Sequence, residues 1–307
     1  MVSFVTWNMQ WAGSSGSAGR ERRRAALTRL ADAHVLCLQE VASGFPAPGG
    51  GTIEDGFAAV AAQLPGHQVA AYAPLERRAP DGARQRLGTM ICSRYPVLQV
   101  LRHSLPWPAD PDQPSLPRGA LEVTLDTPGG LLRVLSVHLE YFSLPQRTAQ
   151  VEQLRALQRE AVAQARRAHP GLPGGGPFAA AARAAPAIVL GDFNMLPDSP
   201  EYARLLAPWR DGTPALADAW RCAHPDAPHA PTVGLHDGSP DAGPPFAFDY
   251  AFVSAGLAGR IRQMQVAGVD TGSAHQPLML ELDCELDFGP ESGPDDAWRG
   301  AANPATG

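Results

Sequence analysis

The sequence of 307 residues has few cysteines, and their spacing excludes the usual cysteine-based sites. The four, Cys37, Cys92, Cys222 and Cys284, lie far apart and form no CxxC pair, which argues against a zinc knuckle and against a disulfide framework. We therefore expect reduced and mostly buried thiols. No apolar run is long enough to span a bilayer, so membrane insertion is not expected.

Several other signals are missing as well. The start, MVSFVTWNMQW, lacks the basic and then long apolar layout of a signal peptide, so we expect it to be the first strand and the protein to be cytoplasmic. The formal net charge of −6 disfavours broad, non-specific duplex binding, although a local basic face could still bind a polyanion. Because no GxSxG, GxxxxGK[ST] or HExxH pattern occurs, the enzyme classes that depend on them have little support.

Strand-like and helix-like patterns alternate along the chain, which is typical of a layered α/β architecture. Short apolar runs predict strands, and the TPGG of ALEVTLDTPGGLLRVLSVHL predicts a hairpin; the other expected strands are SFVTWNM, HVLCLQEV, HQVAAYAPL, TMICSRYPVLQVL, AIVLGDFN, FAFDYAFVS, RQMQVAGV and PLMLELD. Helical patterns occur at RERRRAALTRLADA, IEDGFAAVAAQL, about Arg147 to Ala168, and DSPEYARLLAP, with Ser199 as N-cap and Pro200 at the first helical position.

Three stretches rich in glycine and proline are expected outside these elements. They are a loop near position 50, an insertion at 169–186, and a tail at 286–307 that we expect to be disordered. The predicted domain therefore covers residues 1–285.

Polar residues stand at the ends of many predicted strands, where the loops of an α/β sheet converge on a site. They are Asn8, Glu40, His138, Asp192, Asn194, Asp249 and His275. Each has a simpler explanation alone, since Asn and Asp favour turns and a single histidine before an apolar run, as in GSAHQPLML, is usually a partly buried one. Together they predict one shared pocket.

The motifs around these residues resemble those of the endonuclease/exonuclease/phosphatase superfamily, which has the fold of deoxyribonuclease I and exonuclease III. In the family's order they are TWNMQ (6–10), LCLQEV (36–41), GTMICSRYPV (88–97), SVHLE (136–140), GDFNMLPDSPEY (191–202), FDYAFVS (248–254) and SAHQP (273–277). The resemblance implies a four-layer α-β-β-α sandwich of two mixed β-sheets packed face to face with helices outside. It also implies metal-dependent hydrolysis of a phosphate ester.

The resemblance assigns a role to each of these residues. Glu40 and the amide oxygen of Asn8 are hard donors suited to Mg²⁺ or Mn²⁺, with Glu40 as the principal ligand. Asp192 would orient and deprotonate the attacking water. Asn194, two residues on and expected on the same face of the strand, would help to hold the site or the phosphate.

The remaining roles concern charge around the phosphate. Asp249 would favour the charged form of His275, and that ring would contact the scissile phosphate. His138 would either donate a hydrogen bond to a phosphate oxygen or protonate the leaving group. Arg118 is a candidate phosphate clamp, with a surface arginine at a strand start as the equal alternative.

One position departs from the family pattern. The residue before His275 is Ala274, where relatives usually have the aspartate of an SDH triplet. Either another group such as Asp270 replaces that carboxylate, or metal binding uses fewer charges, or the site is impaired.

The sequence therefore predicts a metal-dependent phosphodiesterase that acts on nucleic acid, by attack of water on phosphorus, and a monomer. The alternatives are a catalytically impaired phosphate- or nucleic-acid-binding protein on the same fold, and a phosphatase or phosphodiesterase for a small molecule or a lipid head group. The arginines of a predicted loop, Arg77, Arg78, Arg84 and Arg86, are the expected contacts for a polyanion.

Overall fold

The computed structural model describes residues 1–11, 16–47, 52–166, 171, 176–179, 183–236, 243–268 and 272–284. These residues form two six-stranded sheets. The first sheet has the order β11 (Ile261–Val266), β12 (Leu278–Leu282), β1 (Val2–Asn8), β2 (Val35–Ser43), β4 (Arg84–Ser93) and β3 (Gln68–Arg78). The second has the order β5 (Val97–Ser104), β6 (Gly119–Thr127), β7 (Gly130–His138), β8 (Ala187–Asp192), β10 (Asp249–Ser254) and β9 (Leu216–Asp218).

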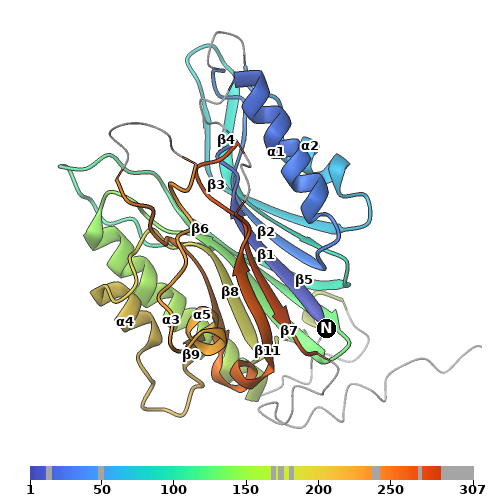
Figure 1. Ribbon diagram of the computed structural model, residues 1–307, viewed down its shortest axis with the longest axis vertical. Coiled ribbons are helices and arrows are strands. Elements are labelled where there is room, and N and C mark those ends of the chain that lie inside the picture. Colours follow the sequence, from blue (N-terminus) through green and yellow to red (C-terminus); the bar gives the residue numbers. More distant parts are fainter. Residues whose placement is uncertain are drawn as a thin grey trace, which may run out of the picture.

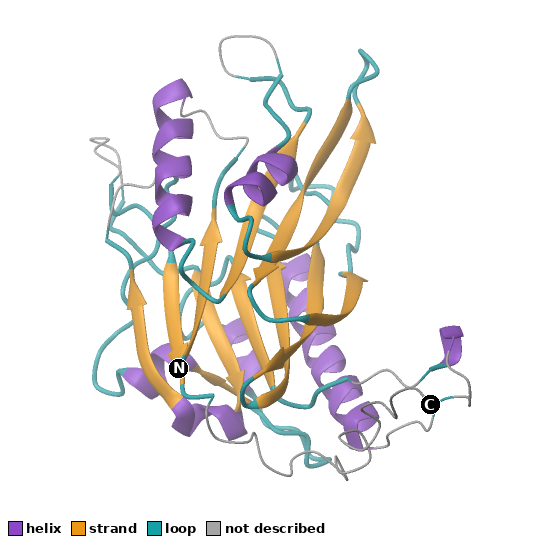
Figure 2. Cartoon of the chain, turned by 90° about the vertical axis from the view of Figure 1, so that its right-hand side faces the viewer, coloured by secondary structure: helices purple, strands orange, loops and turns teal. Residues whose placement is uncertain are grey.

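Both sheets are mixed. The β1–β2 and β7–β8 pairs are parallel and the others are antiparallel. Figure 1 shows the sheets stacked, with α1 and α2 beyond the first and α3 and α4 beyond the second; Figure 2 shows the same layers from the side. The predicted four-layer α-β-β-α sandwich is confirmed.

Three apolar clusters hold the layers together. One lies between the sheets and includes Phe4, Val123 and Leu280. The second joins the outer face of the first sheet to α1 (Gly16–Leu30) and α2 (Gly56–Gln63), and the third joins the second sheet to α3 (Leu144–Arg166) and α4 (Pro200–Leu206). Because each sheet buries both faces, its central strands carry nearly continuous apolar runs.

Most helix boundaries follow from local signals in the sequence. The Ser199 hydroxyl accepts a hydrogen bond from the Tyr202 amide and Pro200 opens α4, as predicted. Asp55 caps α2 in the same way. The predicted helix at 147–168 begins three residues earlier, at Leu144, and ends at Arg166. Besides α3, α4 and the short α5 (Ala219–Ala223), two 3-10 turns occur, η1 (Gly176–Phe178) and η2 (Ala255–Arg260).

The prediction of one strand at TMICSRYPVLQVL was wrong. The segment forms β4 in the first sheet and β5 in the second, because the chain crosses between sheets at 94–96. Pro96 has no amide hydrogen for a ladder, and Ser93 ends β4 by exchanging hydrogen bonds with Tyr95. The short β9 and α5 were not predicted.

Three predicted regions fall partly or wholly outside the described residues. They are the loop near position 50, the insertion at 169–186 and the tail at 286–307. Asp270 is also outside them. Among the described residues, no helix is long and apolar enough to cross a membrane. The cysteines there are free thiols, with Cys37, Cys92 and Cys284 buried and Cys222 exposed.

Candidate active site

The predicted polar residues converge at one end of the sandwich. His138 and Asp249 flank Asp192 on the neighbouring strands of the second sheet, in register with it. Asn8 from the first sheet and His275 from the loop before β12 approach the same carboxylate, and Glu40 contacts Asn8 and lies near His138. Asp192 is therefore the centre of the cluster.

Glu40 reaches this cluster because β2 is irregular at that point. The β2–β4 register shifts between Leu38 and Val41, and Glu40 has a positive φ of 53°. A bulge of this kind redirects a side chain that regular pleating would place elsewhere. The Glu40 side chain is 28 % exposed, the most accessible carboxylate of the cluster.

Asn8 bridges the two sheets through its amide. Its Nδ2 donates to Glu40 Oε1 at 3.0 Å and to Asp192 Oδ2 at 2.9 Å, while its Oδ1 accepts from the Gln10 amide at 3.1 Å. The sequence predicted the oxygen as the metal-facing atom, and here the nitrogen faces the carboxylates. Two carboxylate oxygens that share one N–H₂ group are both satisfied, which accounts for this orientation.

Asp192 ends β8 beside a position that only glycine can occupy. Gly191 has a φ of 152°, and a Cβ there would lie 2.0 Å from the Val137 carbonyl oxygen of β7. The first residue of GDFN thus allows the parallel β7–β8 pair to close next to the Asp192 carboxylate. Burial, together with the charge of Asp249, raises the pKa of Asp192 to about 7 against the lowering effects of His275 and Asn8.

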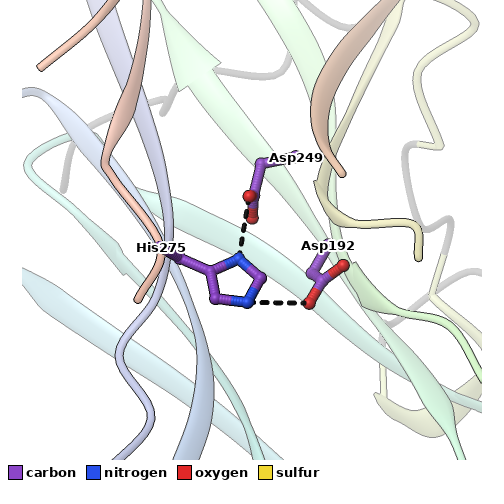
Figure 3. A group of neighbouring side chains, drawn as sticks. All are labelled: Asp192, Asp249 and His275. Carbon is purple, nitrogen blue, oxygen red and sulfur yellow. Dashed lines mark hydrogen bonds and ion pairs between the residues drawn. The ribbon is translucent and has the colours of Figure 1, made fainter. Parts of the chain in front are cut away.

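His275 and Asp249 form the predicted pair, drawn in Figure 3. His275 Nδ1 donates to Asp249 Oδ2 at 2.9 Å, and its Nε2 lies 3.8 Å from Asp192 Oδ2. Burial lowers the pKa of His275, but the Asp249 and Asp192 carboxylates outweigh it and raise that pKa to about 10. The ring is therefore charged at neutral pH.

His138 has the opposite electrostatic character. Its Nε2 lies 3.5 Å from Asp192 Oδ2 and 4.0 Å from Glu40 Oε1. Burial and the positive charges of Arg118 and His275 hold the pKa of His138 well below its usual value. A neutral ring can donate a hydrogen bond but is a poor proton donor for a leaving group, which favours the first of its two predicted roles.

Arg118 is a buried residue, so the alternative of a surface arginine is wrong. It lines a narrow recess together with His138, Gly88 and Gly119. Its Nε donates to Glu140 Oε2 at 3.1 Å, and Glu140 is fully buried. The guanidinium is thus held by one carboxylate beside the polar cluster around Asp192.

Asn194 does not have the predicted orientation. β8 ends at Asp192, and Asn194 lies beyond it with a positive φ of 49°, so strand alternation does not apply. Its amide Nδ2 donates to the Leu139 carbonyl at 2.9 Å, and its backbone N–H donates to Asp192 Oδ1 at 3.0 Å. Asn194 thereby fixes the Asp192 carboxylate through its backbone and joins the loop after β8 to the loop after β7.

Several other motif residues hold the segments that carry the site side chains. Gln39 accepts from Thr6 Oγ1 and donates to Ser136 Oγ, which links the two sheets through a buried polar contact. Trp7 donates from Nε1 to the His275 carbonyl, and Ser273 Oγ donates to the Asn8 carbonyl. These bonds fix the backbone that carries the charged side chains.

Ala274 lies exposed at this edge, and its backbone is hydrogen-bonded to the segment that follows β1. Its amide donates to Gln10 Oε1 at 2.8 Å. Because Asp270 lies outside the described residues, the idea that it replaces the missing aspartate stays a prediction.

Two residues that hold site side chains, Thr232 and Glu140, were not predicted from the sequence. Thr232 donates from Oγ1 to Asp249 Oδ2 at 2.7 Å, and Asp249 Oδ1 is buried without a hydrogen-bond partner among the described residues. Nothing in the local sequence marks Thr232. Glu140 was within the SVHLE motif but was given no role.

The described residues offer two ways to hold a cation. One is the group Asp192, Asp249 and His275, whose ligand atoms lie within 4.8 Å of one another. The charged His275 ring already offsets one of the two carboxylates of that group, and its ring nitrogens carry protons, so a cation would have to displace it. The other is Glu40 with Asp192, whose oxygens share the Asn8 amide; hard oxygen donors with one accessible carboxylate fit Mg²⁺ or Mn²⁺.

The arginines proposed for a polyanion lie in strands rather than in a loop. Arg77 and Arg78 end β3 and Arg84 and Arg86 begin β4, because a tight turn joins these strands. Arg84 pairs with Glu76, and Arg86 pairs with Asp55. Nearby acids thus neutralise part of this surface.

Comparisons with known proteins agree with this arrangement. The model of the endonuclease/exonuclease/phosphatase family matches residues 5–275. A search among curated sequences found no match. An endonuclease/exonuclease/phosphatase from Beutenbergia cavernae is 24 % identical, with 91 % of this chain and 70 % of that one covered and a TM-score of 0.60.

Two other solved structures share the fold at lower identity. A mannosyl-6-phosphatase of Bacteroides thetaiotaomicron is 16 % identical over 92 % of this chain and 100 % of that one, with a TM-score of 0.62. Truncated TDP2 of Caenorhabditis elegans is 18 % identical over 91 % and 96 %, with a TM-score of 0.58. Since the family match spans nearly the whole described chain, the chain belongs to the endonuclease/exonuclease/phosphatase family.

Proposed function

We propose that the protein is a divalent-metal-dependent phosphodiesterase that cleaves nucleic acid by attack of water on phosphorus. The main support for the proposal is the set of N–H groups around one carboxylate oxygen, Asp192 Oδ2. Asp192 Oδ2 lies 2.9 Å from Asn8 Nδ2, 3.5 Å from His138 Nε2 and 3.8 Å from His275 Nε2. A carboxylate among N–H groups from both sheets is suited to hold and deprotonate a water beside a phosphate.

The chain's own residues divide the remaining work. Asp192 has a pKa near neutrality, the range in which a general base is most effective. The charged His275 donates toward the phosphate oxygens, and Asp249 keeps it charged. Neutral His138 donates a hydrogen bond, while Arg118, oriented by Glu140, clamps the phosphate.

Glu40 is the principal residue that would hold Mg²⁺ or Mn²⁺, with Asn8 as its partner. When bound, the ion supplies positive charge to the non-bridging phosphate oxygens. Asn8 would turn its amide over to present Oδ1, giving up the hydrogen bond from Gln10.

The test is hydrolysis of bis-p-nitrophenyl phosphate with Mg²⁺ or Mn²⁺ and with EDTA, beside the monoester p-nitrophenyl phosphate. We expect cleavage of the diester, its loss in EDTA and its recovery on adding metal. Full activity after thorough chelation would refute the metal requirement. A panel of single-stranded DNA, duplex DNA, abasic DNA, RNA and phospholipid head groups then identifies the substrate.

Two observations favour other functions, and the same assay separates them. Ala274 favours an impaired phosphate-binding protein, which would bind the diester without cleaving it. The likeness to a mannosyl-6-phosphatase favours a small phosphate ester, which would show as faster cleavage of the monoester.

Asp218→Asn is a matched control for Asp192→Asn. Asp218 is also a buried carboxylate of the second sheet beside a histidine, with its Oδ2 2.6 Å from His229 Nε2. We expect Asp218→Asn to affect folding and to leave turnover per folded molecule unchanged.

A further inference from the structure

Four aromatic rings form a continuous strip beside the catalytic edge. The aromatic strip consists of Tyr141, Phe142, Phe248 and Phe246. Tyr141 contacts Phe142 and Phe248, with ring centroids 4.8 and 6.1 Å apart, and Phe248 contacts Phe246 at 4.5 Å. Phe248 directly precedes Asp249, and Tyr141 lies three residues after His138. The strip therefore borders the catalytic residues.

The rings at one end of this strip are open to solvent although their backbone is firmly held. Tyr141 is 51 % exposed and Phe142 is 53 % exposed. Both backbone amides donate to Glu140 Oε1 at 3.0 Å, and Arg147 donates to the carbonyls of Glu140 and Tyr141. A rigid loop that presents large apolar rings to water is typical of a binding surface.

The same carboxylate orients a cation. Glu140 holds Tyr141 and Phe142 through Oε1 and Arg118 through Oε2. A guanidinium that matches phosphate oxygens and rings that match a flat aromatic group are thus fixed by one buried residue. Phosphate and a flat ring are the two recognisable parts of a nucleotide.

At its other end the strip reaches a hollow with room for more of a polymer. Phe246 lines this open hollow together with Leu196, Asp198 and Arg221, and Arg221 pairs with Asp198. The chain contains no lysine, so every cationic side chain available here is an arginine or a charged histidine.

We propose that the aromatic strip stacks the unpaired bases of a single-stranded nucleic acid next to the phosphate that is cleaved. This inference rests on the proposed phosphodiesterase function and names its substrate as single-stranded. Stacking needs an open base face, which a duplex covers, and each stacked base is worth roughly 5- to 150-fold in affinity. Binding of a lipid surface by the same exposed rings is the alternative that the test must exclude.

The test compares two oligomers with equal charge, a fluorescein-labelled tetrathymidylate and an abasic tetramer of the same backbone. Binding is followed by fluorescence anisotropy with EDTA-treated protein, and again with Asp192→Asn in Mg²⁺. We expect tetrathymidylate to bind at least about fivefold more tightly. Equal affinity for the two oligomers, or no binding of either up to millimolar concentration, overturns the proposal.

Variants locate the preference on the strip. Tyr141→Leu and Phe248→Leu keep apolar bulk and remove the ring, so they should weaken tetrathymidylate binding about fivefold or more and leave the abasic tetramer unchanged. Phe178→Leu, which alters another exposed phenylalanine in η1, is the matched control and should bind like the wild type. Unchanged tetrathymidylate binding in both strip variants refutes the proposal.

Two further outcomes distinguish the possible failures. If vesicles of phosphatidylcholine with phosphatidylserine sediment with the protein in a Tyr141-dependent manner and tetrathymidylate shows no preference, the strip is a lipid contact and the proposal is wrong. If bases are preferred but no diester is ever cleaved, the strip proposal holds and the proposed catalytic function fails.

Discussion

Replacing Asp249 with asparagine should remove the charge that keeps His275 protonated while nearly preserving the side-chain shape. The Nδ1–Oδ2 distance of 2.9 Å corresponds to an attraction of about 6 kcal/mol at an effective dielectric of 20. That equals about four pK units. In the variant, burial still lowers the pKa of His275, and only the more distant Asp192 carboxylate raises it. That pKa should therefore fall from about 10 to below 7.

The sign of the stability effect follows from the raised pKa. A histidine with a pKa of about 10 when folded and 6.5 when unfolded stabilises the fold fully below pH 6.5, and this contribution is lost as pH rises through 10. Between pH 7 and pH 10 the wild type should therefore lose about 3 kcal/mol that Asp249→Asn does not lose, as an order of magnitude. The chain has no lysine, so no lysine titration adds to this interval.

The assay is urea unfolding of both proteins at pH 7 and pH 10, in EDTA so that no cation contributes. Thr232→Val is the control, because it removes the hydroxyl that donates to Asp249 and keeps the charge. The unfolding free energy that Thr232→Val loses relative to the wild type should be equal at the two pH values. An equal pH dependence for wild type and Asp249→Asn would show that Asp249 does not hold His275 in its charged form.

Three more predictions concern the site and its support. Asp192→Asn should lower turnover by roughly a hundredfold or more with folding kept, and a near-normal rate in the cleavage assay would contradict its role as base. Ala274→Asp should lower the Mg²⁺ concentration for half activity about tenfold, largest at limiting metal; an unchanged metal titration would mean that this exposed position does not face the ion. Glu122→Gln should cost about 3 kcal/mol in urea unfolding at pH 7, since buried Arg133 and Arg183 lose their carboxylate. Burial raises the pKa of Glu122, but His103 and these arginines outweigh burial and lower that pKa to about 2. The difference in unfolding free energy between wild type and Glu122→Gln should therefore shrink as pH falls from 4.5 to 2. A difference that does not change with pH would refute this prediction.

The sequence predicted that these polar residues share one edge of the sandwich, because most of them stand at strand ends. Asp192, His138 and Asp249 lie on adjacent strands in register, and that strand order comes from the structure rather than from the sequence. His275 lies in a loop, and its motif rather than any periodicity located it. The hairpin of β6 and β7 and the N-cap of α4 could also be predicted, because both depend on residues that are close in the chain.

What the sequence could not predict depends on contacts between distant segments. The chain crosses from one sheet to the other at 94–96, and the local break at Ser93, Arg94 and Pro96 does not indicate that the next apolar run joins the other sheet. Asn194 lies past the end of its strand, so alternation gives the wrong direction for its side chain. The bulge that directs Glu40 toward the site has no local sequence signal. The partner of Arg118 is 22 residues away on another strand end, and no local pattern indicates it.

The charges around Asp192 predict that activity needs a bound cation. They also predict that alanine at position 274 still allows that cation to bind. Glu40, Asp192 and Asp249 bring three carboxylates together, and the charged His275 offsets one of them. Arg118 is already paired with Glu140, so it adds little net positive charge. An incoming phosphodiester anion would therefore meet a negative site unless a divalent ion were bound. An aspartate at position 274 would add a further negative charge and raise the demand for cations. With alanine there, one divalent ion is sufficient to balance the site, so titration of the metal-free protein with Mn²⁺ should reveal one tight site, and a second tight site should appear only in Ala274→Asp.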